Sequence, residues 1–147
     1  MTSIYVYQKH IDIIHSVVAN LPEEGAGELA TIGDNTYIFV EDGVALPEQP
    51  SEIHLEPVEL NETLRTQISQ ASPHVRLINE RIVEKIRTQY TENDELKFAH
   101  LGWQVAMGEV QDEVTLSELE DFNAFVEQAR SWGRVEKEKL GLGDSNS

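Results

Sequence analysis

The sequence predicts an α+β protein: a small antiparallel β-rich N-terminal part followed by a three-helix C-terminal part. The first half contains short β-branched and aromatic runs, whereas apolar residues recur at helical spacing in the second half. Three prolines mark an extended connector between the two. We therefore expect a β-rich region, a connector, a helical region and a frayed tail, at residues 1–45, 46–58, 59–142 and 143–147.

The N-terminal part is predicted to contain a hairpin. Residues 4–7 (IYVY) are typical of a strand, and residues 29–32 and 36–40 flank the turn sequence Gly-Asp-Asn. This pattern predicts a hairpin near residues 29–40. Residues 11–18 fit either a helix or a strand, and both alternatives stay open. Residues 53–55 are a candidate edge strand within the connector.

Three helices are predicted after residue 70. Ser72 is placed as an N-cap before Pro73, ahead of apolar residues three or four positions apart: Val75, Ile78, Ile82, Ile86 and Tyr90. Thr91 and Asp94 have the spacing of a capping box and begin a helix to about Met107. Apolar residues lie nearly all round this helix, so we expect it to be the most buried. Thr115 and Glu118 are predicted to cap the third helix, which has an apolar stripe of Leu119, Phe122, Val126 and Ala129.

Composition limits the possible functions of this 147-residue chain. Hydrophobic residues make up 39% and charged residues 26%, which is typical of one globular domain. Cysteine is absent, which excludes disulfides, thiolate metal sites and cysteine nucleophiles. No apolar run approaches the roughly 18 residues of a membrane span, and the N-terminus does not resemble a secretory signal. We expect a soluble protein.

Acidic charge is the strongest compositional signal. The chain has 27 Asp and Glu against 11 Lys and Arg, a formal net charge of -16. Residues 1–60 contain 11 acidic side chains and one basic one, Lys9. This charge repels nucleic acid and anionic membranes and favours a basic partner, so we expect no direct nucleic-acid or membrane binding.

The sequence contains no recognisable catalytic, cofactor-binding or metal-binding motif. The five histidines lack the spacing of a helical zinc pair, and the glycines form no phosphate-binding loop. The acidic loop before residue 114 does not match the calcium-binding pattern. We expect a non-enzymatic protein with no cofactor and no metal.

Four aromatic residues are candidate partner contacts. Trp103 and Trp132 lie on two predicted helices, where a core position is the alternative role for each. Tyr5 and Tyr7 share one face of the first strand, which could pair with another chain if it is an edge strand.

The helical half resembles small tail-associated proteins of tailed phages and Mu-like prophages. The resemblance covers about residues 70–142 and rests on SPHVRLINERIVEKIR at 72–87, Tyr90, DELK at 94–97, FNAFVE at 122–127, RSWGR at 130–134 and KLGL at 139–142. It implies a tail-associated or tail-fibre-assembly protein in the host cytoplasm or virion. Residues 101–117 form a longer insert than that pattern has.

The resemblance implies a protein that binds other tail or assembly proteins, or a second copy of itself, and catalyses nothing. A second hypothesis comes from the acidic N-terminal half: an inhibitor that imitates nucleic acid and binds a basic host protein. An enzyme that uses its carboxylates is the weakest hypothesis.

Overall fold

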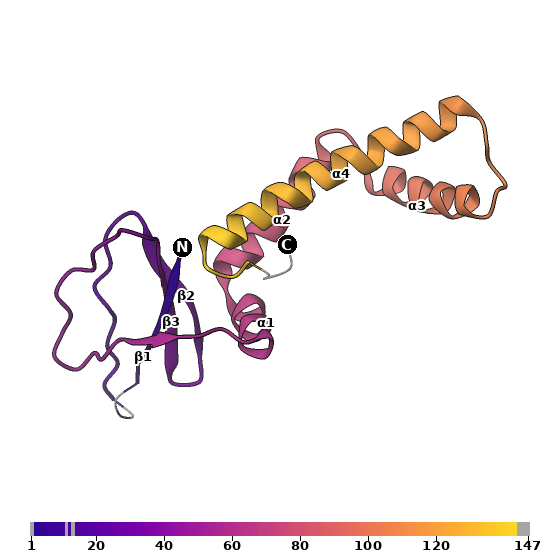
Figure 1. Cartoon of the computed structure of the whole chain (residues 1–147). Coiled ribbons are helices and arrows are strands. Elements are labelled where there is room, and N and C mark those ends of the chain that lie inside the picture. Colours follow the sequence, from indigo (N-terminus) through magenta and orange to yellow (C-terminus); the bar gives the residue numbers. More distant parts are fainter. Residues whose placement is uncertain (1, 11, 13, 144–147) are drawn as a thin grey trace. The chain divides into compact units, whose positions relative to one another are not determined.

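The protein has an α+β fold, as the sequence predicts. The computed structural model describes residues 2–10, 12 and 14–143, which form a four-stranded antiparallel sheet and four α-helices (Figure 1). The chain divides into two compact units, one of residues 1–78 with 134–147 and the other of residues 79–133. Most of the predicted tail, residues 144–147, lies outside the described residues.

The sheet belongs to the first unit and has the order β2-β3-β1-β4. Its strands are β1 (Ser3–Gln8), β2 (Ala26–Ile32), β3 (Asn35–Val40) and β4 (Glu56–Val58). β2 and β3 form the predicted hairpin, and Gly33 takes the positive φ of 62° that its turn requires. The edge strand expected at residues 53–55 occurs three residues later, as β4.

Both faces of the sheet are covered within this unit. On one face, Tyr7 and Ile38 pack with Ala19 and Ile53 from the irregular segments that connect the strands. On the other face, the Phe39 ring lies edge-on to His74 with 6.1 Å between centroids. Gly141 approaches the same face so closely that a Cβ there would lie 2.8 Å from Ile4 Cδ1.

Residues 11–18, for which helix and strand were both open, form neither among the described positions. An isolated antiparallel bridge joins His10 to Ser16, and the Asp12 carboxylate accepts hydrogen bonds from the backbone N–H groups of Ile14 and His15 at 2.8 and 2.9 Å. An Asx turn of this kind satisfies backbone donors locally and so competes with regular structure. Residues 11 and 13 lie outside the described residues.

The prediction of three helices is wrong, because a fourth helix, α1 (Glu62–Ala71), precedes them. It begins at Asn61, whose side-chain Oδ1 accepts the Leu64 N–H at 2.7 Å. α1 buries Ile68 and packs against β2. Its only aliphatic residues with large side chains are Leu64 and Ile68, so it lacks a strong apolar stripe.

The second helix, α2 (Pro73–Arg87), begins at Pro73 as predicted, but Ser72 does not cap it. The Ser72 hydroxyl is buried and has no hydrogen-bond partner in the part of the chain that the structure describes. The backbone N–H of Ser72 instead donates to the Ile68 carbonyl and ends α1. Ser72 therefore joins two helices without acting as a side-chain cap.

The caps of the last two helices show one confirmed prediction and one correction. Thr91 and Asp94 form the predicted capping box at the start of α3 (Glu92–Ala106). α4 (Glu113–Lys139) begins two residues before Thr115, and the Asp112 carboxylate accepts the Thr115 N–H at 2.9 Å. Asp112 therefore caps α4, and Thr115 is not the cap.

An aromatic core holds the second unit together. Phe98 of α3 stacks on Phe122 of α4 with 4.6 Å between ring centroids. Tyr90 lies edge-on to both rings, at 5.8 and 5.0 Å, and Ile86 of α2 belongs to the same cluster. The predicted α4 stripe of Leu119, Phe122, Val126 and Ala129 is buried, as expected.

Candidate functional site

The α3 helix presents one face to the core and leaves the other exposed. Phe98 is buried and Leu101 and Val105 pack against the core cluster, with the spacing of three and four that defines one helix face. Phe98 is the only buried residue of α3. The expectation that this would be the most buried helix is therefore wrong.

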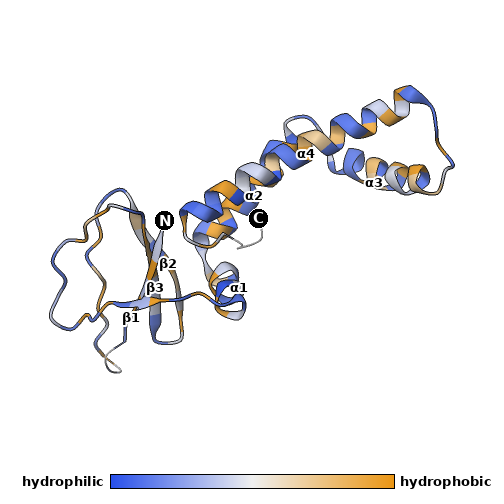
Figure 2. Ribbon diagram, viewed as in Figure 1, coloured by the Kyte–Doolittle hydropathy of each residue, from blue (hydrophilic) through white to orange (hydrophobic). Residues whose placement is uncertain are grey.

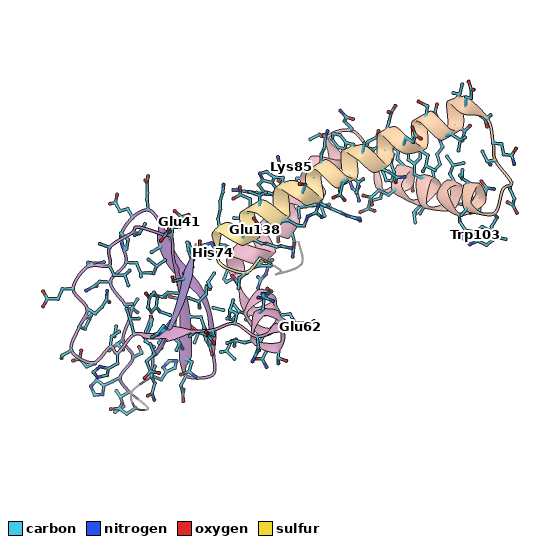
Figure 3. All side chains as sticks on the ribbon, in the orientation of Figure 1. Glu41, Glu62, His74, Lys85, Trp103 and Glu138 are labelled. Carbon is cyan, nitrogen blue, oxygen red and sulfur yellow. The ribbon has the colours of Figure 1, made fainter. Side chains whose placement is uncertain are left out.

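Four exposed residues on the opposite side of α3 form a continuous line, which we call the α3 stripe: Leu96, His100, Trp103 and Met107, the last being the C-cap. Their spacings of four, three and four are those of the contact positions in a helix that packs against another helix. Leu96 is 70% exposed, Trp103 60% and Met107 61%. Figure 3 shows the Trp103 side chain on the side of α3 away from α4.

Small residues flank the stripe. Ala99 and Ala106 are exposed beside Trp103, where their short side chains would let another helix approach closely. Figure 2 shows polar and apolar residues interleaved along α3, as a helix with apolar residues on two sides requires. The exposed apolar side chains are not scattered singly, so they mark a candidate interaction surface.

Acidic residues predominate in the segment of the chain that contains the α3 stripe. Residues 92–121 contain nine Asp and Glu and one basic residue, Lys97. Glu92 is exposed near one end of the stripe and Glu109 near the other. Some of this acidity is used structurally, because Glu95 pairs with Arg87 at 3.1 Å and Asp94 belongs to the capping box.

Hydrogen bonds lower the pKa values of the two capping carboxylates near the stripe. The backbone N–H and hydroxyl of Thr91 lower the pKa of Asp94 below its ordinary value of 3.8. The hydroxyl of Thr115, followed by its backbone N–H, lowers the pKa of Asp112 in the same way. Both groups therefore remain ionised at neutral pH and secure the starts of α3 and α4.

Trp132, the second tryptophan candidate, is half-buried on α4. The Lys85 ammonium lies over its ring, 4.6 Å from the centroid. Both residues line an open hollow of about 330 Å³ together with Phe125. Lys85 already occupies the face of this ring, so Trp132 offers less free apolar surface than Trp103.

The two tyrosine candidates do not lie on an edge strand. β1 pairs with β3 along one side and with β4 along the other. Tyr7 is 2% exposed, and its hydroxyl oxygen accepts the Ala19 N–H at 3.2 Å. Tyr5 is half-buried against the same core. The condition under which β1 could pair with another chain, a free edge, is therefore not met.

The actual edge strands are poorly suited to pairing with another chain. β2 has a register irregularity between Glu28 and Ala30, and α1 packs against it. β4 has three residues, one of which is Pro57. Bulges, prolines and short length are known protections against edge-to-edge association.

The first unit contains an open hollow of about 490 Å³ with polar walls. Glu52, His54 and Glu56 line it, and all three are exposed. Among the described residues, no group of three or more His, Cys, Asp or Glu side chains is placed to hold a metal ion. His15 and Asp12 form a pair at 2.8 Å, also at the surface.

The family models, curated proteins and solved structures searched contain no match to this chain. Within the described residues, none of the helices combines the length and the apolar character needed to cross a membrane.

Sequence reasoning singled out Trp103 but missed the other members of the α3 stripe. Leu96, Trp103 and Met107 were assigned to a buried helix because apolar residues occur nearly all round it. The four-three-four spacing that includes His100 was the signal that could have identified them. Trp103 lies with these residues in the second unit, and both tyrosines belong to the first.

Proposed function

We propose that this chain is a non-enzymatic, tail-associated structural or assembly protein of a phage or prophage, and that it acts through protein–protein contacts. The observation that carries the proposal is the α3 stripe. Three large apolar side chains that are 60% or more exposed lie on one face of a regular, capped helix. Burial of such a surface against another protein is favourable, because it removes apolar side chains from water.

The resemblance of residues 70–142 to phage tail-associated proteins supports the biological setting. That segment contains α3 and the parts of α2 and α4 that belong to the second unit. Residues 101–117, where the sequence is longer than that pattern, include Trp103 and Met107. We propose that this longer segment adapts the chain to its own partner.

The proposal is tested by induction of the source prophage or infection with the source phage. Tails and tail-assembly intermediates are then purified, and the chain is quantified in each fraction by mass spectrometry. We expect the chain to sediment with tails or with a defined assembly intermediate. Its presence only as a free protein throughout infection would contradict the proposal.

A further inference from the structure

We propose that the α3 stripe binds a basic amphipathic helix of a partner protein. This inference rests on the proposed function, because it names the kind of partner for the same surface. The partner helix would insert apolar side chains between Leu96, Trp103 and Met107. Its Lys and Arg side chains would meet the exposed carboxylates near the two ends of the stripe.

The spacing of the stripe indicates that the partner is helical. Side chains at i, i+4, i+7 and i+11 form a nearly straight line on a helix, because two turns take about seven residues. A line of this kind fits the apolar seam of another helix, whereas an extended strand presents side chains at a period of two. The exposed Ala99 and Ala106 leave room for a second backbone beside Trp103.

The charge near the two ends of the stripe indicates that the partner is basic. Glu92 and Glu109 are exposed near its two ends, and Lys97 is the one basic residue between positions 92 and 121. Apolar burial would supply most of the affinity, and the carboxylates would select cationic partners and speed their association.

The same charge disfavours a second copy of this chain as the occupant. If two α3 helices packed antiparallel, the Glu92 end of each would meet the Glu109 end of the other. If they packed parallel, each end would meet the same end of the other helix. Either arrangement brings two strongly acidic segments together, and like charges across an interface oppose association.

His100 gives the stripe a polar centre. It lies between Leu96 and Trp103 at a contact position of the seam and is exposed. A polar residue at such a position typically fixes register and partner choice and reduces affinity. We expect His100→Leu to tighten binding of any apolar helix and to reduce discrimination among partners.

The experiment uses the full chain with Trp132→Phe, so that Trp103 is its only tryptophan. Three synthetic 21-residue peptides are titrated. The first is a helix with Leu at the positions that would contact the stripe, spaced three and four apart, and Lys elsewhere. The second has Glu in place of each Lys, and the third has the composition of the first in scrambled order. Affinity is measured from Trp103 fluorescence and by calorimetry. We expect the basic amphipathic peptide to bind at least tenfold more tightly than either control, and more weakly as salt increases.

Two variants identify the binding surface by calorimetry. The double substitution Leu96→Ser with Trp103→Ser should weaken binding of the basic amphipathic peptide at least tenfold. Val83→Ser, which changes a 49%-exposed residue on α2 of the same unit, should leave the affinity within twofold. Circular dichroism verifies that both variants retain the wild-type helix content.

Three outcomes would overturn the proposal: equal binding of the basic and acidic helices, unchanged affinity in the double variant, or a chain dimer in sedimentation that this variant dissociates. The last outcome would assign the stripe to a second copy. If one of these outcomes occurs while the chain is still found in tails, only the proposal of a basic-helix partner is refuted. Absence of the chain from tails and their intermediates would refute the proposed function, whatever the peptides do.

Discussion

Phe98 and Trp103 lie five residues apart on α3 and have opposite environments. Phe98 is 8% exposed and stacks on Phe122, whereas Trp103 is 60% exposed on the far side of the helix. The helix therefore has a structural face that holds the second unit together and an apolar face that the described part of the chain leaves largely uncovered. These two faces respond differently to substitution.

Phe98→Ala is expected to destabilise the protein by about 3–5 kcal/mol, because it leaves a cavity between Tyr90 and Phe122. Leu96→Ser, on the exposed face, should change the free energy of unfolding by about 0.5 kcal/mol or less. Urea unfolding followed by circular dichroism measures both. A similar loss in the two variants would show that Leu96 is buried in solution.

Tyr7→Phe tests the assignment of Tyr7 to the core. The substitution keeps the ring but removes the hydroxyl that accepts the buried Ala19 N–H. We expect a loss of about 1–3 kcal/mol, because the donor is left without a partner. Tyr5→Phe serves as the matched control on the same strand face. Equal effects of the two substitutions on the urea midpoint would argue against the Tyr7 hydrogen bond.

The contact between Lys85 and Trp132 is expected to contribute a small coupling free energy to stability. The ammonium lies over the ring at 4.6 Å but remains exposed, which places the interaction at about 0.5–1 kcal/mol. A double-mutant cycle with Lys85→Met and Trp132→Leu measures it by urea unfolding. Additive effects of the two substitutions would show that the ring and the cation do not interact.

The caps of α3 and α4 predict a loss of stability in acid. The folded-state pKa values of Asp94 and Asp112 lie below the ordinary 3.8, so their contribution is complete above that pH. This contribution to stability is lost as the pH falls through the folded-state pKa values, because protonation removes the negative charge of the carboxylates that accept these hydrogen bonds.

This pH dependence is measured as the urea midpoint at neutral pH and at about pH 3. Asp94→Asn with Asp112→Asn retains an oxygen acceptor at both positions but removes the titration, so the double variant should lose less stability than the wild type between the two pH values. Asp121→Asn, within α4 and away from its cap, is the control for loss of an exposed carboxylate. Identical pH dependence in wild type and double variant would contradict the assignment.

Local patterns in the sequence predict the hairpin and the capping box. Gly33 supplies a positive φ between two β-rich runs, and Thr91 with Asp94 has the spacing that satisfies helix N-terminal donors. Both features need only neighbouring residues to form, so the sequence contains the necessary information. The α4 stripe is predictable for the same reason, since its spacing alone defines the face.

The remaining features depend on tertiary packing. α1 was missed because Leu64 and Ile68 give too little periodicity, although Asn61 is a strong capping residue. The exposed face of α3 was missed because apolar periodicity identifies a face without showing what covers it. The central position of β1 depends on its pairing with β4, more than 40 residues later in the chain.

The central claim, that the α3 stripe is the surface through which this chain joins a tail, is tested most directly in particles. The chain is replaced by the Leu96→Ser with Trp103→Ser variant or by Val83→Ser, and the amount recovered with purified tails or assembly intermediates is compared with wild type. The account predicts at least a tenfold loss for the double variant and no change for Val83→Ser. Wild-type recovery of a folded double variant would contradict it.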